Sequence, residues 1–324
     1  MEENTEQRID LTLFSEKIQE LKDRIASVIV GQEQTVDLVL TAILANGHIL
    51  IEGVPGVAKT LLARLTARLV DADFSRIQFT PDLMPSDVLG TTVFNMKNND
   101  FDFHRGPIFA DIVLVDEINR APAKTQAALF EVMDERQITI DGMTYRMGDL
   151  YTILATQNPV EQEGTYKLPE AQLDRFLMKI TMSYPSLDEE VNILERHHTN
   201  TSLVKLDNVV PAITREELLS LRALMGQVFV DRTLIQYIAM IVQQTRTSKA
   251  VYLGASPRAS VAMLQSSKAY ALLQGRDFVT PEDIKFVAPF VLQHRLILTA
   301  EAEMEGYSPV KVTQRLIDRV EVPK

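Results

Sequence analysis

One short stretch constrains the fold more than any other part of the chain. An apolar segment from Ile49 to Ile51 runs into a glycine-containing turn that ends in Lys59 and Thr60. Glycines let backbone N–H groups point toward a polyphosphate, a lysine ammonium reaches the β and γ phosphates, and a hydroxyl at the start of the next helix can ligate Mg²⁺. The stretch predicts a strand, a phosphate-binding loop and a helix, and a nucleoside triphosphate as ligand. The residues expected to contact it are Gly53, Pro55, Gly56, Val57, Ala58, Lys59, Thr60 and Leu61.

One position in this loop departs from the general pattern. GxxxxGK[ST] has glycine where this chain has Ala58. The context supports the assignment, because the loop follows an apolar strand and precedes the helical pattern of residues 60–69. Taken alone, the stretch also fits a glycine turn that only joins a strand to a helix.

Composition restricts the class of protein. The chain has 324 residues, of which 46% are hydrophobic, so it can bury a full core and has room for about two domains. It has no cysteine, which excludes disulfides, thiolate zinc sites and cysteine nucleophiles. The net charge of −11 and the pI near 5.1 oppose a broad phosphate-neutralising surface, so nucleic acid is not an expected partner.

The N-terminal residues and the length of the apolar runs indicate where in the cell the protein is expected. Residues 1–10 are acidic and polar, without the apolar centre of a signal peptide. Apolar runs such as 38–45 fall well short of the roughly 20 residues that a transmembrane helix needs. We therefore expect no membrane span and a cytoplasmic protein.

Short apolar strands alternate with helical patterns between Leu11 and about Tyr184, which predicts an α/β fold with a parallel sheet flanked by helices. The expected core strands are residues 49–51, 74–79, 112–115 and 152–155. Two hairpins are also expected, at 91–104 around a turn at 97–100 and at 137–146 around Asp141-Gly142.

Helical patterns replace strand patterns from about Leu187 onward. We expect an αβ core over residues 1–185, a linker near 184–186 and a smaller all-helical lid over 186–324. Thr214, Ser256 and Thr280 are expected to begin helices, the last two because a proline follows at the first helical position. Arg258 then lies in a first helical turn, where the helix dipole disfavours a cation, which suggests that it binds an anion.

Two acids follow a buried strand at Asp116 and Glu117. A strand end would deliver both to the nucleotide, with Asp116 in the Mg²⁺ shell and Glu117 accepting a hydrogen bond from the attacking water. Alone, the pair also fits two acids that begin a loop. Beside the Lys59 loop, the catalytic interpretation is favoured.

Two further polar residues are candidates for catalysis. Asn158 ends another strand and is suited to orient the water or contact the γ-phosphate, although an asparagine turn before proline fits equally well. Arg175 follows Asp174 between Leu173 and Phe176, and either stabilises transition-state charge on a neighbouring subunit's nucleotide or forms a local surface pair.

Taken in order, these motifs resemble those of the AAA+ ATPases, and most closely the MoxR family. The resemblance extends from about Val30-Gly31-Gln32 to the end of the chain, and Ala58 is usual within the family. The motifs that carry it are GVPGVAKT at 53–60, VDEINRAP at 115–122, ATQNP at 155–159, LPEAQLDRF at 168–176 and SPR at 256–258.

The resemblance implies a role for each of these residues. Lys59 and Thr60 would bind phosphate and Mg²⁺, Asp116 and Glu117 would be the Walker B pair, and Gly31 and Gln32 would lie near the adenine. Asn158 would be sensor 1, Arg175 a finger acting on a neighbouring subunit, and Arg258 sensor 2 in the lid. Arg105 and Arg120 fit either a subunit interface or a structural role.

The resemblance also implies partners. It predicts a ring homo-oligomer, expected to be a hexamer, that hydrolyses ATP with Mg²⁺ to remodel or activate a protein client. A client with a von Willebrand factor A domain is the expected kind, and metal or cofactor insertion is one plausible outcome. The two hairpins would project toward the ring pore or the substrate, with surface decoration as the alternative.

Four other functions compete with this one. A nucleotide-gated scaffold with little turnover is opposed by the full set of charge-stabilising groups. A chelatase-type motor subunit shares the same fold. A DNA helicase is opposed by the acidic charge, and a kinase lacks an evident acceptor base.

Overall fold

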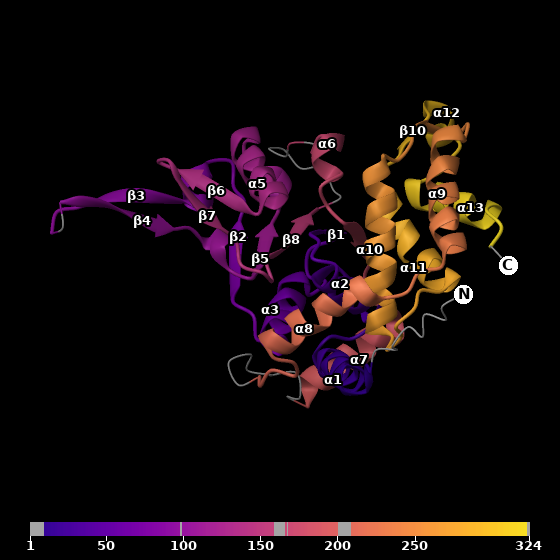
Figure 1. The fold of residues 1–324 in the computed structure, drawn as a ribbon, viewed down its shortest axis with the longest axis horizontal. Coiled ribbons are helices and arrows are strands. Elements are labelled where there is room, and N and C mark those ends of the chain that lie inside the picture. The colour runs from indigo at the N-terminus through magenta and orange to yellow at the C-terminus, as the bar shows by residue number, and fades with distance from the viewer. Residues whose placement is uncertain (1–9, 98, 159–165, 167, 200–208, 323–324) are drawn as a thin grey trace, which may run out of the picture.

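A computed structural model describes residues 10–97, 99–158, 166, 168–199 and 209–322. Figure 1 shows a sheet-containing core, a group of C-terminal helices beside it and one long hairpin that projects away from the body. Pro159 and residues 1–9, to which part of the sequence argument referred, lie outside the described residues.

A parallel sheet forms the centre of the core. Its order is β2-β5-β8-β1-β9 in the part of the chain that the structure describes. Since all five strands run in one direction, their carboxyl ends share one edge. The α/β fold and the four predicted strands are confirmed, while β9 was not predicted. The strands are β1 (Ile49–Gly53), β2 (Phe74–Gln78), β5 (Ile112–Asp116), β8 (Thr152–Gln157) and β9 (Met178–Met182).

Helices cover both faces of the sheet. Alternate residues of β1 point to opposite faces, so Ile49 and Ile51 join one hydrophobic cluster while Leu50 joins the other. The first cluster includes residues from α1, α2 and α3, and the second includes Leu129 and Phe130 of α5. This double burial explains why the strands are continuous apolar runs. The core helices are α1 (Thr12–Val28), α2 (Glu33–Leu44), α3 (Lys59–Leu69), α4 (Pro85–Leu89), α5 (Ala123–Glu135) and α6 (Glu170–Leu173), with short 3₁₀ turns η1 (Pro107–Phe109) and η2 (Ile118–Arg120).

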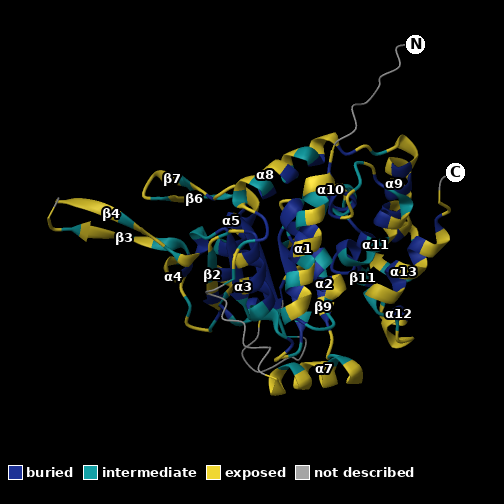
Figure 2. Ribbon diagram, turned by 90° about the horizontal axis from the view of Figure 1, so that it is seen from below, coloured by how far each residue is buried: buried dark blue, intermediate teal, exposed yellow. Residues whose placement is uncertain are grey.

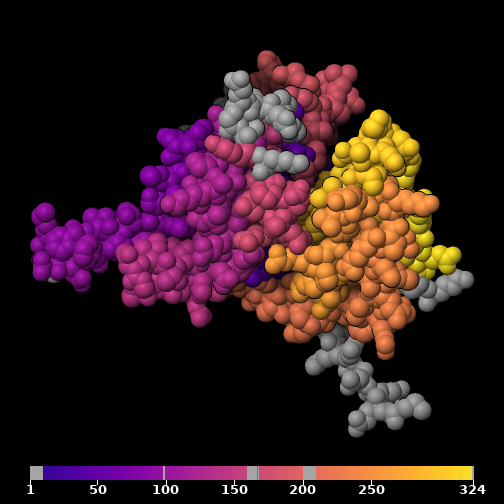
Figure 3. Space-filling model, turned by 90° about the horizontal axis from the view of Figure 1, so that it is seen from above, coloured from indigo at the N-terminus to yellow at the C-terminus, as the bar shows by residue number. Residues whose placement is uncertain are grey.

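Both predicted hairpins are present. β3 (Gly90–Asn95) pairs antiparallel with β4 (Asp100–Arg105), and β6 (Gln137–Ile140) pairs with β7 (Met143–Arg146). The β3–β4 hairpin stands away from the body and is largely exposed (Figures 2 and 3). Near its tip, Phe94 and Phe101 form an edge-to-face pair with ring centroids 5.2 Å apart, and Met96 is 89% exposed.

The C-terminal part is mainly helical, as predicted, with one small addition. Thr214 and Thr280 form capping boxes at the starts of α8 and α11, which confirms those helix starts. The addition is an antiparallel ribbon of β10 and β11, so the lid is not entirely helical. The elements are α7 (Leu187–His198), α8 (Arg215–Leu224), η4 (Met225–Gln227), α9 (Arg232–Thr247), β10 (Val251–Leu253), α10 (Pro257–Leu273), α11 (Pro281–Leu292), β11 (Ile297–Leu298), α12 (Ala300–Met304) and α13 (Pro309–Arg319).

The lid helices pack against the core and not only against one another. α10 contacts α2, α11 contacts β9, and their buried side chains join the same hydrophobic cluster as α2. α8 also bonds to the core, because Arg215 forms an ion pair with the buried Asp111 and Arg222 donates to the carbonyl of Ile43. Within the described residues, no helix combines the length and apolar character needed to cross a bilayer.

Candidate functional site

A pocket of about 430 Å³ lies at the carboxyl edge of the parallel sheet. β1, β5 and β8 are neighbours in the sheet, so the residues that follow them converge there. The pocket therefore brings together the predicted phosphate loop, the acid pair and Asn158. Its lining residues are Gly53, Pro55, Gly56, Ala58, Lys59, Thr60, Leu61, Asp116, Glu117, Thr156 and Asn158.

The loop between β1 and α3 depends on two residues in the left-handed region. Gly56 has φ +89°, and a Cβ at this position would point into open space. Ala58 has φ +60° and ψ 21° directly before α3. That conformation explains why the general motif has glycine there, because it strains an L-residue by about 1 kcal/mol. The chain retains the loop geometry in spite of the alanine.

Lys59 is held against the loop that precedes it. Its Nζ donates to the carbonyl oxygens of Gly53 at 2.6 Å and Val54 at 3.2 Å. Burial lowers the pKa of Lys59, while the charges of Asp116 and Glu117 oppose that shift. The ammonium group therefore lies in the pocket beside two carboxylates, at the N-terminal end of an 11-residue helix whose dipole also favours an anion.

Asp116 is fixed at both carboxylate oxygens. Thr156 of the neighbouring strand donates to Oδ1 at 2.5 Å, and Arg76 of β2 donates to Oδ2 at 2.6 Å. The side chain of Asp116 is 15% exposed. These two bonds fix the orientation of a carboxylate that lines the same pocket as Thr60.

Glu117 follows in a strained backbone conformation, with φ 55° and ψ 51°. Its N–H donates to Thr156 Oγ1 at 3.0 Å. Its Oε2 accepts from Gln78 Nε2 at 2.9 Å and from Arg120 Nη1 at 2.7 Å. Because non-glycine residues rarely adopt this conformation, its presence here suggests that it serves to aim the carboxylate.

Several predicted residues do not line this pocket. The side chain of Val57 is buried in the hydrophobic core, and Arg175 donates to the carbonyl of Phe130 at 2.6 Å within its own chain. Arg258 is exposed in the first turn of α10, as predicted. None of these three residues lines the Lys59 pocket.

Gly31 and Gln32 lie at the start of α2 and do not line the Lys59 pocket. Gly31 has φ +71°, a conformation that favours glycine, and a Cβ there would displace the carboxyl group of Glu189 in α7, 2.3 Å away. Gln32 accepts a hydrogen bond from Thr35 at 2.9 Å and borders a separate hollow of about 220 Å³ between α1 and α2.

The two arginines with open assignments have intrachain contacts. Arg120 forms the ion pair with Glu117, and Arg105 lies 5.1 Å from the ring centroid of Phe109. Both contacts fit structural roles.

Sequence reasoning missed three residues that hold the acid pair: Thr156, Arg76 and Gln78. Arg76 and Gln78 are two residues apart on β2 and so share a face, and polar side chains on a core strand were the available signal. Thr156 was within a recognised motif but received no role. Its importance depends on the pairing of β5 with β8, which the sequence did not reveal.

The fold and this site define a P-loop ATPase core with a helical lid, and comparisons with known proteins agree. The family described as "ATPase family associated with various cellular activities (AAA)" matches residues 48–178, and the AAA lid domain matches residues 243–317. A crystal structure of a protein from Cytophaga hutchinsonii superposes with a TM-score of 0.88 at 40% identity, covering 97% of each chain.

Curated relatives identify the family more closely. The chain is 44% identical to Chaperone MoxR1 of Mycobacterium tuberculosis over 92% of this chain and 80% of that protein. It is 46% identical to the uncharacterized protein YeaC of Bacillus subtilis over 93% of each, and 31% identical to protein MoxR of Methylorubrum extorquens over 91% of each. This chain belongs to the MoxR family of AAA+ ATPases, as the sequence motifs predicted.

Proposed function

We propose that this chain is a Mg²⁺-dependent ATPase that assembles into a ring and uses hydrolysis to remodel or activate partner proteins. One observation carries the proposal: Lys59, Thr60, Asp116, Glu117 and Asn158 line a single pocket at the carboxyl edge of the sheet. That set contains a phosphate-binding cation, oxygen ligands, a general base and a polar contact for the γ-phosphate.

The residues present fit both ATP and Mg²⁺. The N–H groups of the loop and of the α3 N-terminus, together with Lys59, would bind the phosphates. Thr60 and Asp116 both line the pocket and supply hard oxygen donors, which Mg²⁺ prefers. When bound, Mg²⁺ neutralises charge on the phosphate oxygens.

Glu117 is the proposed general base. Its carboxylate would accept a hydrogen bond from the attacking water, while Gln78 and Arg120 hold that carboxylate in place. Asn158 is proposed to orient the water or contact the γ-phosphate from the end of β8. Both groups project from strand ends, which limits their motion.

Completion of the site by a neighbouring subunit is a further part of the proposal. Arg175 is proposed to act in trans on the neighbour's nucleotide, and Arg258 to contact nucleotide from the lid. The side chain of Arg175 is 29% exposed, so part of it remains open to a neighbour. A hexameric ring with an αβ core over 1–185 and a lid over 186–324 is the expected assembly.

A protein client is proposed from relatives and surface chemistry. MoxR1, which is 44% identical, is named a chaperone. The β3–β4 hairpin exposes Phe94, Met96 and Phe101 near its tip, which suits contact with a polypeptide. A partner with a von Willebrand factor A domain is the proposed class, and the cysteine-free chain agrees with the reducing cytoplasm as its location.

The Glu117→Gln variant tests the catalytic assignment. We expect its ATP affinity to stay within about threefold of the parent, because glutamine keeps the shape of the side chain, and its turnover to fall by about 10²- to 10⁴-fold through loss of the base. Glu131→Gln, on the exposed face of α5, is the matched control and should retain the parent rate. Hydrolysis by Glu117→Gln at the parent rate would remove Glu117 from this role.

The same measurement separates the competing functions. A parent protein that binds ATP and assembles without turnover would favour a nucleotide-gated scaffold. Turnover that appears only with a partner would favour a chelatase-type motor subunit or a client-activated ATPase.

A further inference from the structure

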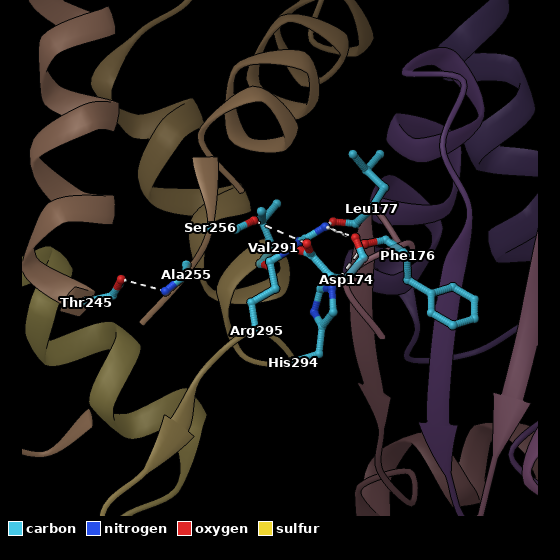
Figure 4. A network of polar contacts seen from close by, with 9 residues as sticks. All are labelled: Asp174, Phe176, Leu177, Thr245, Ala255, Ser256, Val291, His294 and Arg295. Atoms are coloured by element: carbon cyan, nitrogen blue, oxygen red, sulfur yellow. Dashed lines mark hydrogen bonds and ion pairs between the residues drawn. The ribbon is translucent and has the colours of Figure 1, made fainter. Parts of the chain in front are cut away.

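Three consecutive polar residues at the end of α11 are buried and reach from the lid into the core. Gln293 donates to the carbonyl of Lys179, and His294 donates from Nε2 to the carbonyl of Phe176 at 3.1 Å. Arg295 follows, and Figure 4 shows its guanidinium meeting the turn that contains Asp174, Phe176 and Leu177. This corner of the lid is therefore tied to one short segment of the core.

Arg295 uses its full set of five N–H donors. Nε donates to Asp174 Oδ1 at 2.6 Å, and the terminal nitrogens donate to the carbonyls of Asp174 at 3.2 Å, Phe176 at 2.6 Å, Leu177 at 3.1 Å and Val291. Its side chain is only 3% exposed. Because this planar guanidinium is buried and all of its N–H groups are hydrogen-bonded, it allows little relative motion between the lid and the core turn that it joins.

Asp174 also contacts the start of the helix that carries Arg258. Its second oxygen, Oδ2, accepts from Ser256 Oγ at 3.2 Å. Ser256 occupies the N-cap position of α10, yet its side chain makes no capping hydrogen bond there. The preceding N–H, of Ala255, is held by Thr245 at 3.0 Å. Asp174 is thus bonded to two separate parts of the lid.

The residue after Asp174 is Arg175, whose own contacts are with α5. Arg175 donates to the carbonyl of Phe130 and forms an ion pair with Asp134 at 3.2 Å. Burial lowers the pKa of Arg295, its bond to Asp174 opposes that shift, and the charge of Arg258 adds to the lowering. Arg258 lies in the first turn of α10, whose N-cap Ser256 bonds to Asp174, so the helix start that Asp174 contacts also carries Arg258.

We propose that Asp174 and Arg295 are positioning residues that couple the lid, which carries Arg258, to Arg175. A change in lid position caused by nucleotide in one subunit then changes where that subunit presents Arg175 to its neighbour. This inference rests on the proposed function, in which Arg175 acts in trans.

The Asp174→Asn variant tests the coupling, because asparagine keeps the shape but loses the charge that binds Arg295. When Asp174→Asn is added to the Glu117→Gln variant, we expect the ATP affinity to stay within about threefold of that of Glu117→Gln alone. Asp174→Asn by itself should turn over ATP about tenfold more slowly than the parent, since small misplacements of a catalytic group cost this much or more. Asp231→Asn is the matched control, because Asp231 caps α9 in the lid and asparagine caps equally well. The control should retain the parent rate.

The decisive readout is complementation. Asp174→Asn subunits keep an intact site, and Glu117→Gln subunits keep a well-placed Arg175. A mixture of the two should therefore hydrolyse ATP faster than the sum of the separate proteins. A loss of packing alone would not be repaired by a neighbour. Ser256→Ala should also lower turnover and be rescued by Glu117→Gln subunits, with a smaller effect than Asp174→Asn. If Asp174→Asn does not fold, Ser256→Ala serves as the test of the coupling.

Two reference results separate this inference from the function on which it rests. If Arg175→Ala is rescued by Glu117→Gln but neither Asp174→Asn nor Ser256→Ala is rescued, the coupling is wrong and the trans finger stands. Parent turnover in both variants also overturns the coupling. If Arg175→Ala is not rescued either, the trans role in the proposed function is wrong and the inference falls with it.

Discussion

Thr156 donates a hydrogen bond to Asp116 at 2.5 Å across neighbouring strands of the sheet. The same oxygen accepts the N–H of Glu117 at 3.0 Å, and the residue is 1% exposed. A single buried hydroxyl thus positions both residues of the acid pair. This contact makes the geometry of the acid pair depend directly on the pairing of β5 with β8.

The first prediction concerns this hydroxyl. Thr156→Val keeps the shape of the side chain but leaves the N–H of Glu117 and one oxygen of Asp116 without this partner. We expect turnover to fall by at least about tenfold, since each such bond contributes about 1 to 3 kcal/mol. Steady-state ATPase assays check this, with Thr156→Ser as the control that retains the hydroxyl. Parent-like turnover in the valine variant would show that the bond does not position the acids.

The second prediction concerns nucleotide affinity. Lys59→Ala removes the only lysine that lines the described pocket. Because hydrogen bonds to charged groups contribute about 1.5 to 3 kcal/mol, we expect ATP affinity to fall by about 10- to 100-fold in calorimetry. Lys124→Ala, at an exposed position on α5, should leave the affinity unchanged. Equal affinity in both variants would contradict the phosphate-loop assignment.

The third prediction concerns the attachment of α8. Arg215 pairs with Asp111, whose side chain is 6% exposed and also accepts the N–H of Asp73 at 3.1 Å. Arg215→Ala removes the positively charged partner of the buried Asp111 carboxylate. We therefore expect the free energy of unfolding to fall by about 2 kcal/mol in denaturant titrations. Arg24→Ala breaks an exposed pair and should cost less than about 1 kcal/mol. Equal costs would mean that burial of Asp111 does not strengthen its pair.

The fourth prediction concerns pH. Burial, with the nearby charge of Arg136, lowers the pKa of His48 in the folded protein to about 3. Because the unfolded chain binds this proton near pH 6.5, the stabilisation is complete above that pH and is lost as the pH falls toward 3.

Between pH 6 and 5 we expect His48 to contribute a loss of about 1.2 kcal/mol of unfolding free energy. His48→Gln should reduce the slope of unfolding free energy against pH by that amount. His197→Gln, at an exposed position on α7, is the control. An unchanged slope in His48→Gln would indicate that His48 is protonated in the folded protein.

Local signals predicted much of the fold. The loop, its flanking elements and both hairpins depend on short-range chemistry, such as glycine turns, caps and apolar runs, and the structure contains them. β9 was missed although its apolar residues alternate with Lys179 and Thr181 in the pattern of a half-buried strand, as suits its place at the edge of the sheet beside β1. The β10–β11 ribbon was missed because it consists of very short strands.

The candidate site divides in a similar way. Lys59, Asp116, Glu117 and Asn158 follow strand ends, so the rule for parallel sheets predicted that they meet. The role of Arg295 was not predicted, because its hydrogen bond to Asp174 joins residues far apart in sequence and no motif near Arg295 indicates that contact. Contacts between the lid and the core depend on tertiary packing that periodicity does not reveal.

The central claim is that this chain hydrolyses ATP at a site that a neighbouring subunit completes. The most direct test is the steady-state ATPase rate per chain across a range of protein concentrations, at saturating Mg²⁺ and ATP, with light scattering on the same samples. We predict that the specific rate rises in step with the oligomeric fraction. Full turnover by samples that scatter as monomers would contradict the claim.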